Sequence, residues 1–129
     1  MSSNLIPDYT RKHRGVQRLL RACGHSWSGL AVAWRHESAF RQEFAGFLCL
    51  LPVFFLIDFN SVERIMLLGS MVLVLIVELL NSAIEAVVDR IGYEHHDLSG
   101  QAKDLASAAV MSSLVFMAIT WASLLLPKL

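Results

Sequence analysis

Three stretches of this chain carry no charged residue, and polar segments separate them. They are residues 44–57, 65–77 and 105–127. A helix that crosses a membrane needs about 20 predominantly apolar residues, and only the last stretch is that long. The other two reach this length when polar residues at their ends lie in the interface or inside a helix bundle. The pattern therefore predicts three transmembrane helices, over about residues 40–58, 62–91 and 102–127.

Between Val16 and Trp34, apolar residues recur at steps of three and four, with Arg18 and Arg21 between them. This spacing is typical of an amphipathic helix, and basic residues together with tryptophans suit the membrane interface. We therefore expect an interfacial helix over about residues 15–34; the alternative is a helix packed on soluble protein. Residues 1–14 form a polar and basic tail ahead of it. The predicted fold is an all-α integral membrane protein whose membrane domain covers residues 15–129.

The charges are balanced in number but not in position. The chain has 11 Lys and Arg against 11 Asp and Glu, and seven of the basic residues precede Phe44. By the positive-inside rule the N-terminus is cytoplasmic, so with three spans the 89–104 loop lies inside and the C-terminus outside. Arg64 falls at the outer end of the second span, where we expect its side chain to snorkel to the interface. Cys23 and Cys49 lie in different kinds of segment and imply no disulfide framework.

Three carboxylates and one amide lie where the second span leaves its apolar section. At 100° per residue, Glu78, Glu85 and Asp89 fall within about 20° of one line along the helix. Asn81 lies about 60° to one side of that line. A charged side chain at membrane depth costs roughly 3 kcal/mol or more, so such residues usually face a protein interior, a partner or a bound ion. The stripe is therefore a candidate functional site.

Carboxylates at a membrane boundary suit a hard cation. Magnesium prefers oxygen ligands and often takes only one or two protein carboxylates, completing its shell with water and phosphates. Glu85 fits that role better than Glu78, and Glu37, ahead of the first span, is a candidate second ligand. Glu78 lies deepest in the apolar section and is the candidate general base for a hydroxyl at the interface. Lys103 and Asp104, at the start of the third span, add a phosphate-pairing cation and another acid.

Each candidate also has a plainer interpretation. Glu78 and Asn81 could simply join helices by hydrogen bonds, and residues 85–90 could be a solvated helix end. His95 and His96 resemble a metal pair, but neighbouring residues on a loop favour a ligand contact or a solvated role over zinc. The sequence has no GxxxxGK[ST] loop, no GxGxxG after a strand and no kinase HRD or DFG motif. Any nucleotide would therefore be held by an unconventional site of carboxylates, metal and a few basic residues.

Three segments of the chain resemble a known family. They are ACGHSWSGLAVAW (Ala22–Trp34), HESAFRQE (His36–Glu43) and VELLNSAIEAVVDRIGYEHHDLSGQAKDLASAAV (Val77–Val110). Together they resemble the prokaryotic diacylglycerol kinases, small integral-membrane lipid kinases, over residues 15–127. The resemblance implies a homotrimer in the bacterial inner membrane, with active sites shared between subunits. It also implies transfer of the γ-phosphoryl group of MgATP to the primary hydroxyl of diacylglycerol, which serves lipid recycling and phospholipid metabolism.

The functional residues of the family carry over by motif. The resemblance implies that Glu78 is the base, that Glu37 and Glu85 hold Mg²⁺, and that Asn81 supports the site. The residues implied in ATP binding are Arg18, His25, Glu37, Glu85, Glu94, His95, His96, Lys103 and Asp104. Those implied in binding the lipid are Arg18, Trp27, Phe40, Arg41, Gln42, Glu43, Glu78 and Ser107.

Two positions depart from the family pattern, because His25 and His95 each stand where well-known members have tyrosine.

Within the family the alternative substrate is undecaprenol. Outside it, the alternative is a small structural or transport subunit whose carboxylates only join helices or conduct ions. The Lys103–Asp104 pair speaks against an ion path, which would not need it. The expected partners are ATP, diacylglycerol, membrane lipids and further copies of the chain, and no nucleic acid is expected.

Overall fold

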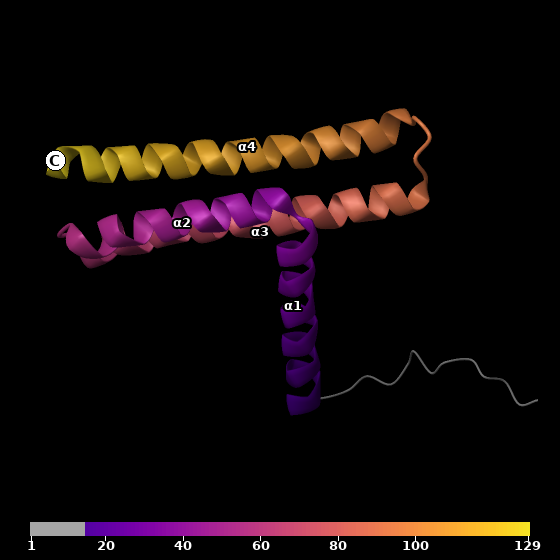
Figure 1. Cartoon of the computed structure of the whole chain (residues 1–129), viewed down its shortest axis with the longest axis horizontal. Coiled ribbons are helices and arrows are strands. Elements are labelled where there is room, and N and C mark those ends of the chain that lie inside the picture. Colours follow the sequence, from indigo (N-terminus) through magenta and orange to yellow (C-terminus); the bar gives the residue numbers. More distant parts are fainter. Residues whose placement is uncertain (1–14) are drawn as a thin grey trace, which may run out of the picture. The chain divides into compact units, whose positions relative to one another are not determined.

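The computed structural model describes residues 15–129, and all regular secondary structure in that part of the chain is helical. The elements are α1 (Val16–His36), α2 (Ser38–Leu56), α3 (Ser61–Ile91), α4 (Asp97–Leu125) and the 3-10 turn η1 (Leu126–Lys128) (Figure 1). The prediction of a polar tail over residues 1–14 concerns a segment outside the described residues. The chain divides into two compact units, and the boundary follows Val32, inside α1. The prediction of an all-α fold is confirmed for the described residues.

Helix α1 covers the predicted amphipathic segment and continues two residues further. No residue from Val16 to Val32 is buried within the chain. Leu19 and Trp27 are among the large apolar side chains exposed there. Gly24 and Gly29 do not interrupt the helix. The placement of α1 in a membrane interface stays a prediction.

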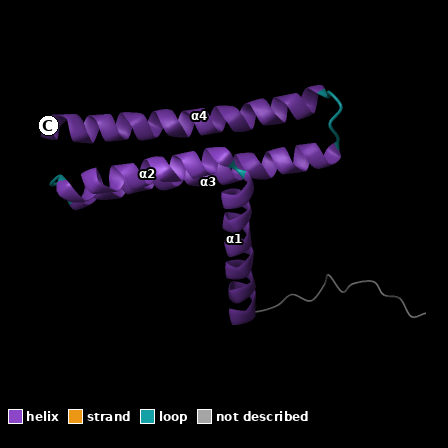
Figure 2. Cartoon of the chain, in the orientation of Figure 1, coloured by secondary structure: helices purple, strands orange, loops and turns teal. Residues whose placement is uncertain are grey.

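Helices α3 and α4 are antiparallel neighbours joined by a short loop, and α2 packs against α3 (Figure 1). Figure 2 shows how little of the described chain lies outside helices. The core gathers around α3, on which Leu67 and Val74 are fully buried. Phe47 of α2, Phe59 of the α2–α3 turn and Trp121 of α4 belong to the same cluster. Helix α3 is thus the central element against which its two neighbours bury their apolar faces.

The helices expose far more apolar surface than they bury. Helices α2 and α3 and the segment Asp97–Lys128 are each long and apolar enough to cross a membrane, which confirms the prediction of three such helices. Only 11, 22 and 17% of their most apolar stretches are buried within the chain. Lipid or further protein must cover the remainder, because soluble monomers rarely expose apolar patches of this extent.

The start of α4 differs from the prediction. The chain becomes helical at Asp97, whereas the hydropathy pattern predicted the third span only from about residue 102. His96 caps this end, since its Nδ1 accepts a hydrogen bond from the backbone N–H of Leu98 at 3.2 Å. A capped first turn needs no apolar residues, so the hydropathy pattern did not reveal it. The loop is therefore shorter than predicted, which keeps the ends of α3 and α4 close together.

Arg64 binds the turn between α2 and α3, and its predicted snorkelling to the interface stays a prediction. Its guanidinium donates to the backbone oxygens of Phe54 at 2.9 Å, Phe59 at 3.0 Å and Ile57 at 3.5 Å. The last carbonyls of a helix have no partner within the helix, and an arginine fork carries enough donors to satisfy several of them. The sequence could not reveal this role, because it depends on how the chain turns between α2 and α3.

Lys128 reinforces the same turn from the other end of the chain. Its ammonium donates to the backbone oxygen of Asp58 at 2.8 Å and lies 3.0 Å from Oε2 of Glu63. Glu63 also completes a capping box with Asn60 at the start of α3. We call Arg64, Lys128, Glu63 and the carbonyls that they bind the turn clamp. It ties the α2–α3 turn to the C-terminal end of α4.

Candidate active site

Glu78 occupies a place on α3 that an apolar core residue would otherwise fill. Leu67, Met71, Val74 and Glu78 follow one another at steps of four, three and four, which keeps them on one face of the helix. Glu78 is 4% exposed. Burying a carboxylate is costly unless it is paired or neutralised. Glu78 therefore faces the protein interior, one of the three surroundings expected for the stripe, and the cost of burying its carboxylate suggests a functional reason.

Three further carboxylates lie near Glu78. Glu37, the N-cap residue of α2, and Glu85 on α3 are both near enough for their charges to act on Glu78. Glu43, on α2, is in turn acted on by Glu78. Among residues 15–129, no ion pair involves any of the four. We call Glu37, Glu43, Glu78 and Glu85 the carboxylate cluster; it concentrates negative charge that no ion pair of the described residues neutralises.

Two buried oxygens at this cluster have no hydrogen-bond partner in the described chain: Oε2 of Glu43 and Oδ1 of Asn81. Asn81 nevertheless orients the cluster, because its Nδ2 donates to Oε1 of Glu85 at 3.2 Å. The predicted supporting role of Asn81 in the active site stays a prediction. Buried polar atoms in proteins are nearly always satisfied, so these oxygens are suited to receive donors from a bound molecule.

A groove of about 450 Å³ runs between α3 and α4 beside Asn81. Small side chains on α4 leave this space, and its other walls are aliphatic. The lining residues are Val77, Leu80, Asn81, Ile84, Ala102, Leu105, Ala106 and Ala109. The groove is thus mainly apolar, and the half-buried amide of Asn81 forms part of its wall.

Asp89, the last residue of the predicted stripe, forms an ion pair across the α3–α4 loop. Lys103 Nζ of α4 lies 2.7 Å from Oδ1 of Asp89 on α3. Sequence reasoning expected Lys103 to meet phosphates and left Asp89 without a role. The signal that could have revealed the pair is the opposite charge of two residues that flank a short loop between antiparallel helices.

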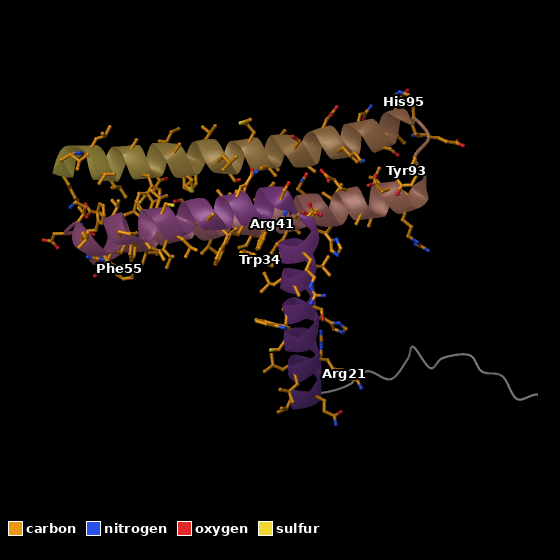
Figure 3. The ribbon with its side chains drawn as sticks, viewed as in Figure 1. Arg21, Trp34, Arg41, Phe55, Tyr93 and His95 are labelled. Carbon is orange, nitrogen blue, oxygen red and sulfur yellow. The ribbon has the colours of Figure 1, made fainter. Side chains whose placement is uncertain are left out.

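The α3–α4 loop carries three of the predicted ATP-binding residues, and all three are exposed: Glu94, His95 and His96. Nδ1 of His96 is used in capping α4, as described above. Nε2 of His95 lies 3.6 Å from Oδ1 of Asp97. Tyr93 and His95 mark this loop in Figure 3. A shallow hollow of about 560 Å³, lined by the residues from Ile91 to Ser99 except Asp97, lies at the loop.

The other predicted site residues are distributed over several elements. Phe40 is buried, whereas Gln42, Asp104 and Ser107 are exposed. Arg41 donates to the backbone oxygen of Trp34 at 2.8 Å, so it braces the junction of α1 and α2 (Figure 3). Arg18, His25 and Trp27 are exposed residues of α1 in the first unit. The roles assigned to these side chains stay predictions.

The donor set of the carboxylate cluster fits a magnesium ion. Glu37 and Glu85 supply hard oxygen ligands of the kind that Mg²⁺ prefers. Among residues 15–129, no group of three or more His, Cys, Asp and Glu side chains is close enough to hold a metal. Two carboxylates from one chain would leave the rest of a magnesium shell to waters and phosphate oxygens, as is common for that metal.

Comparison with known proteins identifies the relatives of this chain. The family model of the prokaryotic diacylglycerol kinase matches residues 24–125. The diacylglycerol kinase of Escherichia coli K12 is 50% identical over 111 residues, which cover 86% of this chain and 91% of that protein. The diacylglycerol kinase of Pseudomonas aeruginosa PAO1 is 46% identical over 122 residues, covering 95% and 99%. That of Haemophilus influenzae Rd is 42% identical over 114 residues, covering 88% and 97%.

The matched region contains α2, α3, α4 and most of α1, and hence the whole carboxylate cluster. The similarity extends over nearly the full length of each relative. The chain belongs to the prokaryotic diacylglycerol kinase family.

Proposed function

We propose that this protein is a diacylglycerol kinase that uses ATP, and that the carboxylate cluster is its active centre. The observation that carries the proposal is the buried Glu78 with the charges of Glu37 and Glu85 beside it. A structural role alone would not require three carboxylates to gather where no ion pair of the described residues neutralises them, since like charges repel. The family of the chain supports a nucleotide and diacylglycerol as the two substrates.

Glu78 accepts the proton of the primary hydroxyl in this scheme. The hydroxyl oxygen forms its bond to the γ-phosphorus of ATP, and the bond from that phosphorus to the β–γ bridging oxygen breaks. The products are phosphatidic acid and ADP. A positioned base contributes about 10²–10⁴-fold to such a reaction. Burial among the core residues of α3 holds the Glu78 carboxylate in place and excludes competing water.

Glu37 and Glu85 are the proposed ligands of Mg²⁺, and Asn81 holds Glu85 in orientation. When bound, the metal offsets the negative charge of the phosphates and of the developing transition state. Lys103 adds a second positive charge from α4. Phosphoryl transfer needs positioning and charge neutralisation more than covalent chemistry, and these side chains supply both.

The proposal also covers the location of the protein, its oligomeric state and the residues that contact its substrates. We place the protein in the bacterial inner membrane with its N-terminus cytoplasmic, and we expect a homotrimer with shared active sites. The extensive exposed apolar surface of α2, α3 and α4 supports a covering of lipid and neighbouring subunits. The proposed lipid contacts are Arg18, Trp27, Phe40, Arg41, Gln42, Glu43 and Ser107. The proposed nucleotide contacts are Arg18, His25, Glu94, His95, His96, Lys103 and Asp104.

The test is phosphoryl transfer by the purified protein in mixed micelles with radiolabelled MgATP. We expect labelled phosphatidic acid when diacylglycerol is present and little ATP consumption without it. Labelled undecaprenyl phosphate in place of phosphatidic acid would contradict the assigned substrate. No ATP consumption with either lipid would contradict the kinase assignment and favour a structural or transport subunit.

A further inference from the structure

The shortest ion pair among residues 15–129 joins α3 to α4 beside the loop. Lys103 Nζ lies 2.7 Å from Asp89 Oδ1, and each side chain is 43% exposed. Asp89 is two residues before the end of α3, and Lys103 lies in the second turn of α4. The contact therefore spans the two helices at a point where both are still regular.

Stability alone does not account for this pair. Ion pairs with half-exposed partners contribute little to folding, because water screens them and two long side chains lose freedom. Buried Val88 on α3 and Ala106 on α4 already provide apolar surface in this region. The pair thus has less influence on whether the helices pack than on where the ammonium of Lys103 lies.

The pair holds the ammonium on the side of the carboxylate cluster. Glu85, one turn before Asp89, is also near enough for its charge to act on Lys103. Arg90, which follows Asp89, is exposed and takes part in none of the ion pairs formed by the described residues. An ammonium has three donors, so one bond to Asp89 leaves two for another partner.

We propose that Asp89 is a positioning residue that holds Lys103 next to Glu85, with two N–H groups free for phosphate oxygens of the nucleotide. The inference rests on the proposed function of the carboxylate cluster. Without the Asp89 carboxylate, the long lysine side chain would sample many rotamers, and nucleotide binding would have to order it. Asp89 touches neither substrate in this scheme and acts only through Lys103.

The first test compares Asp89→Asn with Asp89→Glu in the mixed-micelle assay with diacylglycerol. We expect Asp89→Asn to raise KM for MgATP about three- to tenfold and to change kcat less, because only the ordering of one side chain is lost. Asp89→Glu keeps the carboxylate and should bring KM back to within about twofold. Asp58→Asn is the matched control, since Asp58 is an exposed carboxylate at the α2–α3 turn. An unchanged KM in Asp89→Asn would overturn the proposal.

A double-mutant cycle separates an action through Lys103 from an independent one. Binding of a non-hydrolysable MgATP analogue is measured for Asp89→Asn, Lys103→Met and the double variant. We expect Asp89→Asn to weaken binding only when Lys103 is present. An equal loss in both backgrounds would overturn the positioning role.

A charge exchange keeps the proposal testable if Asp89→Asn does not fold. The variant with Asp89→Lys and Lys103→Asp rebuilds the pair but puts the cation on α3. We expect it to recover the thermal midpoint while binding the MgATP analogue poorly, whereas recovery of both would overturn the proposal. An inactive wild-type protein would contradict the proposed function instead, and analogue binding would then test Asp89 separately.

Discussion

The two ends of the unit Ala33–Leu129 use charged side chains in opposite ways. In the turn clamp every charged group has a partner within the chain: Arg64 binds three backbone carbonyls, and Lys128 binds Glu63 and the oxygen of Asp58. In the carboxylate cluster the charges share one sign, and two buried oxygens at it lack a partner in the described chain. Both ends are built from residues that a membrane helix usually avoids.

The difference separates stability from chemistry. A satisfied polar network stabilises the fold, whereas an unsatisfied buried group costs free energy until a ligand arrives. The turn clamp therefore needs nothing from outside the chain, and the carboxylate cluster is suited to receive a cation and donors. Substitutions at the two ends should thus have opposite consequences, with stability lost at one and activity at the other.

The largest expected effect is that of Glu78→Gln. Glutamine keeps the shape of glutamate but cannot accept the hydroxyl proton, so turnover should fall by about 10²–10⁴-fold. Binding of MgATP should stay within about threefold of wild type, because the base makes no contact with the nucleotide in the ground state. Kinetics in mixed micelles and direct MgATP binding measure the two quantities. Glu63→Gln, the same change within the turn clamp, is the control and should leave turnover near wild type.

Near-normal turnover of Glu78→Gln would remove Glu78 from the role of base. Loss of turnover in both Glu78→Gln and Glu63→Gln would remove the distinction between the two ends.

Glu85→Gln should have the next largest effect, on metal dependence. An amide oxygen carries no net charge and binds a hard cation less well, so half-maximal activity should need about 10- to 100-fold more Mg²⁺. Activity titrated against MgCl₂ at fixed ATP measures this shift. An unchanged titration would exclude Glu85 as a ligand.

Arg64→Met should affect stability and not activity. The variant leaves carbonyls at the end of α2 without donors, which should lower the free energy of unfolding by about 2 kcal/mol. Arg64→Lys should recover part of this loss, because a single ammonium reaches fewer carbonyls than a guanidinium fork. Thermal unfolding in detergent micelles gives the stability, and turnover below the midpoint gives the activity. A selective loss of turnover without a change in midpoint would show that the turn clamp serves catalysis.

Lys128→Gln should have the smallest effect. Lys128 and Asp58 are exposed and Glu63 is only partly buried, so the thermal midpoint should fall by only about 1–3 °C. The difference from wild type should shrink as salt is added, since salt screens the pair with Glu63. The fall in thermal midpoint could instead match that of Arg64→Met or stay the same as salt is added. Either result would show that Lys128 contributes more to the stability of the turn clamp than its exposed position predicts.

Local patterns account for what could be predicted. The three membrane-length helices follow from uncharged stretches, and α1 follows from a period of three to four residues. The common face of Glu78, Glu85 and Asp89 follows from helix geometry alone. The early start of α4 was missed because its cap, His96, and its polar first turns carry no hydropathy signal.

Contacts between elements account for what could not be predicted. Arg64 binds backbone carbonyls up to ten residues away, a role that the hydropathy pattern did not predict. Lys103 meets Asp89 across the loop, 14 residues earlier in the chain. Such contacts depend on the positions of two helices and on the path of the turn between them. The spacing of residues along one helix determines neither the positions nor the path.

The sequence by itself determined the class of the protein, its three helices of membrane-spanning length, its family resemblance and the carboxylate stripe, because hydropathy, periodicity and motifs are properties of neighbouring residues. The tertiary structure decided which charges are satisfied. It buried Glu78 among core residues of α3, left the carboxylate cluster without an ion pair among the described residues, and joined Asp89 to Lys103. The physical reason is that the cost of a charge depends on its surroundings in space, and helix packing alone brings those surroundings together.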